Sequence, residues 1–171
     1  MEFLHGRTES GLLRRLQPSY SQDMDKGAYI LILKNDECRI QVGAQGQRTF
    51  SAGWHAYVGS ALGPGGFSRV MRHFRLNRDK NKSPRWHIDS LLLSPYFQVV
   101  LACCIHTEER IECHLARHMT GTVIVGFGSS DCTCKGHLFY YPSDPHEYIL
   151  RNIQSFAEKE RNAFQIEVRT P

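Results

Sequence analysis

Five short motifs in this sequence carry side chains that could do chemistry together. They are Gly27-Ala28-Tyr29, Tyr57-Val58-Gly59, Arg69-x-x-x-His73, Trp86-His87-Ile88-Asp89 and Glu112-Cys113. An arginine stays protonated at every physiological pH and can bind two phosphate oxygens at once. A tyrosine, with an ordinary pKa near about 10, is a poor base at neutral pH unless a cation or a histidine assists it. The motifs therefore suggest phosphate chemistry in which the tyrosines depend on their neighbours.

The positive charge of the chain is concentrated near these motifs. The chain has 171 residues and a net charge of +4. The strip from Arg69 to Arg85 holds seven basic side chains and one acidic side chain, so it carries +6 and the rest of the chain carries −2. A basic patch on a neutral-to-acidic body is typical of a phosphate-binding surface, although a solvated helix face is the alternative. We expect the basic residues after Arg69 to contact a nucleic-acid backbone: Arg72, Arg75, Arg78, Lys80, Lys82 and Arg85.

A second group of side chains has the composition of a soft metal site. Cys132, Cys134 and His137 lie within six residues, and Asp131 or another histidine could supply a fourth ligand. Zinc sites usually space their cysteines as C-x₂₋₄-C, so the C-x-C spacing here is irregular. Three interpretations stay open, namely a structural zinc ion, buried thiols in a tight loop, or a segment whose Asp131 and His137 shape a neighbouring pocket. A Cys113 nucleophile is disfavoured, because adjacent helical residues point in different directions.

The composition indicates one globular domain. Hydrophobic residues make up 41% and charged residues 22% of the chain, which is ordinary for a folded protein. No apolar run approaches the roughly 18–20 residues that span a bilayer, and the charged residues of Met1–Glu9 are unlike a signal peptide. We therefore expect a cytoplasmic protein with no membrane partner, whose six cysteines are reduced thiols.

The hydrophobic pattern predicts the elements that must position these motifs. It predicts strands over residues 28–33, 38–42, 54–58, 97–105 and 137–141, and an apolar segment over 122–127. It predicts helices over residues 67–76, 86–93, 108–119 and 145–160, with Thr107 as the N-cap of the third. His87 and Asp89 are expected to supply an N-terminal cap of the second helix and a partner of the basic strip. Strands that come first and then mix with helices indicate an α/β (α+β) fold with a small sheet. We expect an N-terminal extension over 1–26, a domain over 27–141, and a helical C-terminal extension over 142–171 packed on that domain.

In their order along the chain, these segments resemble the GIY-YIG nuclease superfamily, and more closely its compact DUF123-type branch. The resemblance covers roughly residues 27–141. It rests on YVGSA at Tyr57–Ala61, R-x-x-R-H at Arg69–His73, WHID at Trp86–Asp89, EC at Glu112–Cys113 and GFGSSDC-x-C-x-x-HLF at Gly126–Phe139. The first motif departs from the family pattern in reading GAY instead of GIY. The late asparagine of many members has no clear match, and Ser130, Asp131 or His137 could stand in its place.

The resemblance implies a small, mainly antiparallel central sheet flanked by helices, and it implies roles for five residues. Tyr29 and Tyr57 would face each other at the sheet edge, and one would orient or activate the attacking water. Arg69 would bind the scissile phosphate with His73 as a polar partner, and Glu112 would bind Mg²⁺ or Mn²⁺. The secondary candidates for the same site are His87, Asp131 and His137.

The function that this resemblance implies is a divalent-metal-dependent endonuclease acting on DNA, with branched or damaged DNA as candidate substrates. The flanking segments are too short for a separate specificity domain, so we expect selectivity to come from the domain itself or from a protein partner. A non-catalytic nucleic-acid-binding module on the same scaffold is the alternative. Glu112 separates the two, because a pure binding module has no use for a carboxylate near phosphates.

Overall fold

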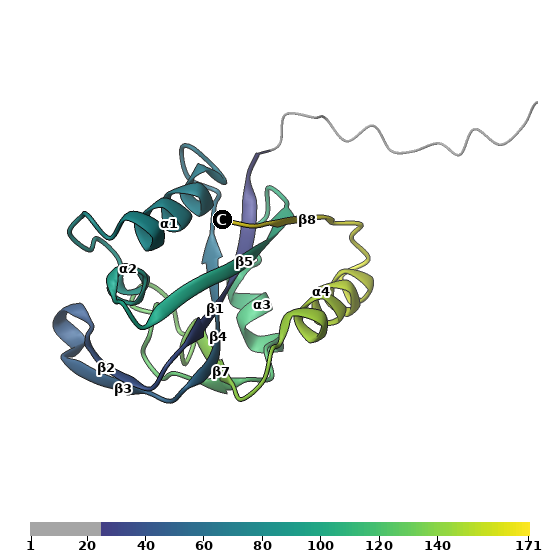
Figure 1. Cartoon of the computed structure of the whole chain (residues 1–171). Coiled ribbons are helices and arrows are strands. Elements are labelled where there is room, and N and C mark those ends of the chain that lie inside the picture. Colours follow the sequence, from purple (N-terminus) through teal and green to yellow (C-terminus); the bar gives the residue numbers. More distant parts are fainter. Residues whose placement is uncertain (1–24) are drawn as a thin grey trace, which may run out of the picture.

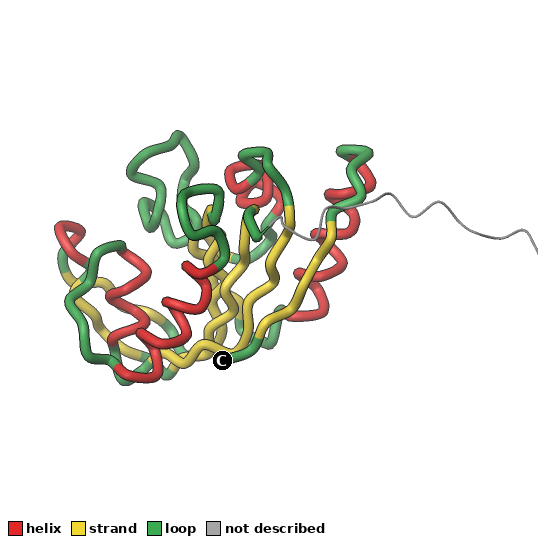
Figure 2. The backbone as a smooth tube through the Cα atoms, turned by 90° about the horizontal axis from the view of Figure 1, so that it is seen from above, coloured by secondary structure: helices red, strands yellow, loops and turns green. Residues whose placement is uncertain are grey.

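A six-stranded antiparallel sheet with helices on both faces forms the centre of the computed structural model, which describes residues 25–171 (Figures 1 and 2). The strand order is β6-β7-β4-β1-β5-β8. The strands of this sheet are β1 (Gly27–Asn35), β4 (Gly53–Ser60), β5 (Phe97–His106), β6 (Thr122–Val123), β7 (Leu138–Tyr141) and β8 (Gln165–Arg169). The predicted α+β class is confirmed.

The remaining elements lie around this sheet. Strands β2 (Cys38–Gln41) and β3 (Gln47–Phe50) pair with each other and enclose a short 3-10 helix (Gly43–Gln45). The helices are α1 (Ser68–Asp79), α2 (His87–Leu93), α3 (Glu112–His118) and α4 (His146–Lys159). None of the helices described between residues 25 and 171 has both the length and the hydropathy of a membrane span.

Strand β1 is buried on both of its faces, which explains its continuous apolar run. Tyr29, Leu31 and Leu33 point to one face, where they pack into a core with α1 and α2. The alternating residues of the strand pack on the opposite face with α3 and α4 (Figure 1). The side chains of Tyr29 and of the two helices that carry the basic strip therefore lie on the same face of the sheet.

The structure differs from the predicted elements in four places. Strand β3 was not predicted, because Phe50 is its only buried residue and its other positions are polar. The third helix begins at Glu112 and not at 108, because the Thr107 hydroxyl accepts the N–H of Glu109 within a turn that precedes the helix. In the apolar segment 122–127, only Thr122–Val123 form a strand.

The fourth difference lies at the C-terminal end of the chain. The predicted helix is present as α4, but the chain then returns to the sheet as β8, which pairs with β5 as an edge strand. The sequence did not predict β8, because an edge strand buries only part of its surface and can therefore contain several polar residues. The segment expected to be a helical extension therefore contributes a strand to the sheet. The N-terminal extension was expected over residues 1–26. Residues 1–24 of it lie outside the described residues.

Candidate active site

Four of the five expected catalytic residues line one cavity of about 490 Å³. Tyr29 comes from β1, Tyr57 from β4, Arg69 from α1 and Glu112 from the start of α3. Strand β7 pairs with β4 only as far as Tyr57, so the last three residues of β4 form part of the cavity wall. Residues spaced over more than eighty positions of the sequence thus reach one site.

The two tyrosines lie on the same face of adjacent strands. Tyr29 is directly opposite Gly59 in the β1–β4 register, and the ring centroids of Tyr29 and Tyr57 are 6.3 Å apart. A Cβ atom at Gly59 would overlap the Tyr29 ring and lie 2.5 Å from its hydroxyl oxygen. The glycine of the Tyr57-Val58-Gly59 motif is therefore required for the Tyr29 side chain to cross the neighbouring strand.

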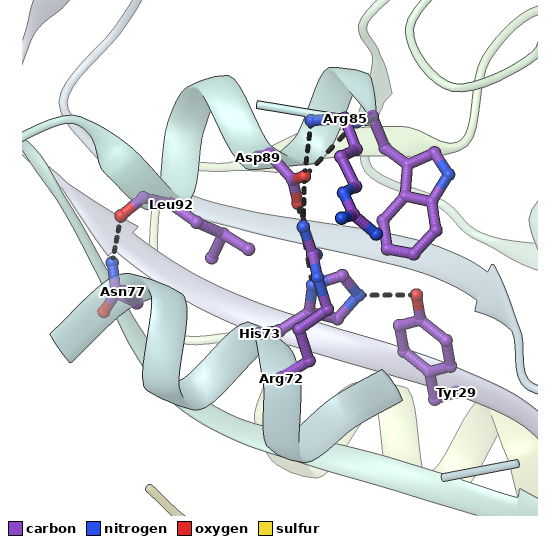
Figure 3. Close-up of polar contacts among 8 residues, drawn as sticks. Tyr29, Arg72, His73, Asn77, Arg85, Asp89 and Leu92 are labelled. Carbon is purple, nitrogen blue, oxygen red and sulfur yellow. Dashed lines mark hydrogen bonds and ion pairs between the residues drawn. The ribbon is translucent and has the colours of Figure 1, made fainter. Parts of the chain in front are cut away.

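His73 lies behind Tyr29 and does not line the cavity. The Tyr29 hydroxyl and His73 Nε2 are 2.8 Å apart (Figure 3). His73 is fully buried, and this burial lowers its pKa to about 4, so the ring is neutral at neutral pH. Its Nδ1 has no hydrogen-bond partner in the described part of the chain, but it lies 4.0 Å from Asp89 Oδ1. We assign the ring proton to Nδ1, beside this carboxylate, so that the Tyr29 hydroxyl donates to Nε2.

Burial also sets the protonation state of the tyrosines. It raises the pKa of Tyr29 well above its ordinary value and that of Tyr57 to about 12. The positive charge of Arg69 acts in the opposite direction on both hydroxyls without reversing the shift. Both side chains are therefore phenols at neutral pH, suited to orienting a water molecule but not to deprotonating it without help.

Arg69 and Arg72 lie one turn apart on α1 and both lie over the Trp86 ring, but they differ in their ion pairing. Arg69 Nη1 donates to the carbonyl oxygen of Ser60 at 2.7 Å, and its guanidinium lies over the Trp86 ring at 4.8 Å. It forms no ion pair with any residue between 25 and 171. Arg72 instead donates two hydrogen bonds to the carboxylate of Asp89, at 2.9 and 2.7 Å (Figure 3). The charge of Arg72 is thus neutralised within the protein, whereas Arg69 remains available to an anion.

Asp89 connects α1 to the start of α2. It is fully buried, and its Oδ2 also accepts the backbone N–H groups of Arg85 at 2.9 Å and Trp86 at 3.3 Å. Burial acts to raise the pKa of this carboxyl, but the hydrogen bonds from Arg72 and these N–H groups outweigh it and hold the pKa below its ordinary value. Of the two residues expected to cap the helix and to pair with the basic strip, Asp89 does both.

Glu112 offers an unpaired carboxylate oxygen at the cavity. Its side chain is 16% exposed, and its Oε2 is buried without a hydrogen-bond partner among the described residues. The nearest basic group, Arg110 Nε, lies 3.9 Å from Oε1. A buried carboxylate oxygen that lacks a partner is costly, and a bound divalent cation would remove that cost. The three secondary candidates, His87, Asp131 and His137, line the same cavity, as does Ser130.

Sequence comparison identifies the family. A family model described as a domain of unknown function, DUF123, matches residues 28–158. The chain belongs to the DUF123 family. The matched region of this DUF123 domain includes the whole cavity and continues past the expected boundary at residue 141 through almost all of α4. No curated protein and no solved structure matches the chain.

The basic strip of the DUF123 domain separates into two groups. Lys80 Nζ donates to the carbonyls of Leu92 at 3.0 Å and Ser94 at 2.6 Å, where it caps the C-terminal end of α2. Arg78 pairs with Asp79 at the surface, and Arg72 is paired with Asp89 as described above. Lys80 Nζ bonds only to the Leu92 and Ser94 carbonyls and forms no ion pair within residues 25–171. Four other residues of the strip also form no ion pair with a described residue, namely Arg69, Arg75, Lys82 and Arg85. Of these, Arg69 and Arg85 line the cavity.

A cysteine cluster lies beside the cavity. The ligand atoms of Cys113, Cys132, Cys134 and His137 all lie within 4.8 Å of one another, so the cluster could bind a metal ion. The fourth ligand of the cluster is Cys113, on α3, and not Asp131 or a second histidine. All six cysteines are free thiols. Burial and the neighbouring thiols raise the pKa of Cys113 to about 12, which is the opposite of what a cysteine nucleophile requires.

Two buried histidines make the stability of the DUF123 domain depend on pH. Burial lowers the pKa values of His55 and His73 from 6.5 to about 4. Between these values the unfolded chain binds protons that the folded chain does not, so the free energy of unfolding falls as the pH falls from 6.5 to about 4. Each histidine contributes roughly 3 kcal/mol to this loss.

Urea unfolding at several pH values across this window tests the prediction. We expect His73→Gln to be less stable at neutral pH but to show a shallower pH dependence, since one of the two titrating groups is gone. The matched control is His114→Gln, which changes an exposed histidine and should retain the dependence of the original chain. Equal slopes in all three proteins would contradict the prediction.

Proposed function

We propose that this DUF123 domain is a divalent-metal-dependent phosphodiesterase of the GIY-YIG type that cleaves DNA. One observation carries the proposal: Tyr29, Tyr57, Arg69 and Glu112 lie on four different elements and line a single cavity. The order of the motifs along the chain does not require this convergence. Two phenols, an unpaired guanidinium and a carboxylate with one unpartnered oxygen form the set of groups that phosphodiester hydrolysis needs.

Arg69 would bind the scissile phosphate. Its guanidinium is held by the Ser60 carbonyl and by the Trp86 ring, so it is oriented before the substrate arrives. A donor that needs no reorientation contributes most where negative charge develops in the transition state. Arg85, on the same cavity wall, would hold an adjacent phosphate of the strand.

Tyr29 would orient the attacking water. Because its hydroxyl donates to His73 Nε2, the lone pairs of its oxygen remain available to accept a hydrogen bond from a water molecule in the cavity. The raised pKa of Tyr29 and the lowered pKa of His73 both disfavour transfer of the proton between them. We therefore assign water orientation to Tyr29, with His73 as a positioning residue and Tyr57 as a second hydroxyl beside the same site.

Glu112 would hold the divalent cation. A Mg²⁺ or Mn²⁺ ion commonly has one or two protein carboxylates and completes its coordination with water and phosphate oxygens. When bound, such an ion supplies charge stabilisation to the phosphate and to the leaving oxygen. The unpartnered Oε2 of Glu112 supports this assignment, because its burial is otherwise uncompensated.

A nicking assay tests the proposal. The full chain is incubated with duplex, branched, nicked, abasic and single-stranded DNA in the presence of Mg²⁺, Mn²⁺ or a chelator. We expect cleavage of at least one substrate with either metal and none with the chelator. Tight binding without cleavage of any of these substrates would contradict the enzyme proposal and favour the non-catalytic binding module. An RNA strand of the same sequence, run in parallel, tests the choice of DNA.

Glu112→Gln should weaken the binding of the catalytic metal. The amide keeps the shape of the side chain but loses its charge, so we expect the metal concentration for half-maximal cleavage to rise by at least about 10-fold. The matched control is Glu109→Gln, which changes an exposed glutamate that does not line the cavity. An unchanged metal dependence in Glu112→Gln would remove Glu112 from the cation site.

A further inference from the structure

The cysteine cluster has the dimensions of a tetrahedral metal site. His137 Nε2 lies 3.4 Å from Cys132 Sγ and 3.9 Å from Cys113 Sγ, and all four ligand atoms are within 4.8 Å of one another. In a tetrahedral zinc site with bond lengths of about 2.3 Å to sulfur and 2.0 Å to nitrogen, neighbouring ligand atoms are about 3.5–3.8 Å apart. Only small side-chain movements are therefore needed to place an ion among the four.

The imidazole of His137 is already oriented for coordination. His137 is 5% exposed, and its Nδ1 donates to the carbonyl oxygen of Val58 at 3.1 Å. That bond assigns the proton to Nδ1 and leaves the lone pair of Nε2 directed at the thiols. Metal-binding histidines usually make such a bond through the nitrogen that does not bind the metal. The backbone of His137 is also fixed, since Val58 N–H donates to its carbonyl and its own N–H donates to Phe127.

The chemistry of these ligands selects the ion. Three thiolates and one imidazole are soft or borderline ligands, whereas Mg²⁺ and Ca²⁺ prefer oxygen. We propose that Cys113, Cys132, Cys134 and His137 bind one zinc ion in a closed Cys₃His site. The site is separate from Glu112, whose oxygen ligand suits the hard cation of the proposed reaction. Its existence does not depend on the proposed function.

A zinc ion here would join α3 to the long loop that precedes β7. Cys113 lies in the first turn of α3, Cys132 and Cys134 lie in the loop between β6 and β7, and His137 directly precedes β7. Residues 124–137 form no helix or strand, and a loop of this length needs other contacts to stay ordered. The ion would attach this loop to α3, and through Val58 to β4. It would act as a structural cross-link between this loop, α3 and β4.

The same cross-link would support the cavity wall. Glu112 directly precedes Cys113, and Asp131 directly precedes Cys132, so both carboxylates lie next to zinc ligands in the chain. The loop also contacts Tyr57, since a Cβ at Gly128 would lie 2.9 Å from the Tyr57 ring. Loss of zinc should therefore disturb the positions of two acidic side chains at the cavity, and this consequence rests on the proposed function.

An ion has a route to the site. Cys113 and Cys132 line the active-site cavity, and Cys134 lines a second cavity of about 420 Å³. The three thiols are only partly buried. The cluster thus lies between two solvent-accessible spaces and does not require unfolding for metal to enter.

Metal analysis of the full chain, purified under reducing conditions, tests the site. We expect about one zinc ion per chain in the original protein and nearly none in Cys132→Ser and Cys134→Ser. The matched control is Cys38→Ser, which changes a buried thiol outside the cluster and should retain the metal. A chain that contains iron in place of zinc, or a Cys38→Ser variant that loses zinc as the other two do, would overturn the assignment.

Cobalt substitution keeps the test decisive if the variants fail to fold. The original chain is stripped with a chelator and titrated with Co²⁺ alone. We expect a thiolate-to-cobalt charge-transfer band and the intense visible bands of tetrahedral Co²⁺, saturating at about one ion per chain and displaced by Zn²⁺. Absence of these bands, together with absence of zinc in the purified chain, would overturn the proposal. A protein that binds zinc but cleaves no DNA would support the zinc site and contradict only the proposed function.

Discussion

Arg69→Ala is expected to lower the rate of DNA cleavage by about 10²–10³-fold while leaving the fold intact. Arg69 is the unpaired guanidinium at the cavity, and its orientation is set by Ser60 and Trp86 before any substrate binds. Its removal takes away a preorganised donor without leaving a buried charge unpaired. The measurement is single-turnover cleavage at saturating metal, with thermal unfolding recorded for the same preparation.

Two further variants separate catalysis from simple attraction to DNA. Arg75→Ala removes an exposed charge from the same helix that does not line the cavity, so it should weaken binding slightly and leave the rate of cleavage of bound DNA unchanged. Arg69→Lys keeps the charge but loses the planar, two-pronged donor, and we expect it to recover only part of the rate. If Arg75→Ala and Arg69→Ala reduce cleavage equally, Arg69 acts only through the general field of the basic strip.

Asp89→Ala is expected to lower the free energy of unfolding by about 3–5 kcal/mol, which is the cost of breaking a buried ion pair by removing one partner. Asp89 is fully buried and accepts hydrogen bonds from Arg72 and from two backbone N–H groups at the start of α2. Alanine would leave the Arg72 guanidinium, which is 23% exposed, without its partner. Urea unfolding at neutral pH measures the loss.

The chain supplies a matched control for this prediction. Asp79 also pairs with an arginine, Arg78, but both side chains lie at the surface. Exposed pairs contribute little, so Asp79→Ala should cost far less stability than Asp89→Ala. Asp89→Asn should lie between the two, since its amide oxygen can still accept one of the bonds. Similar losses in Asp79→Ala and Asp89→Ala would show that the buried pair does not fasten α2 to α1.

Much of the candidate site can be predicted from the sequence because its motifs are local. The Tyr29 and Tyr57 motifs each end or begin a strand, and Arg69 lies at the start of a helix whose apolar spacing is plain. The continuous apolar run of β1 indicates a strand buried on both faces. Elements with weaker local signals were missed, because β3 fully buries only Phe50 and β8 fully buries no residue, and a half-buried edge strand has the composition of a loop.

The sequence by itself identified the residues that could carry the proposed chemistry, and the tertiary structure decided which of them line one cavity and which are paired within the protein. Arg69 and Arg72 have the same residue type and neighbouring places on one helix, yet only Arg72 meets Asp89, seventeen residues further along the chain. Cys113 and His137 are separated by twenty-four residues, and no local spacing pairs them. Ion pairing and metal-site geometry depend on distances of a few ångströms between side chains. Packing of α1, α2, α3 and the β6–β7 loop around the sheet sets those distances, and neither composition nor periodicity encodes them.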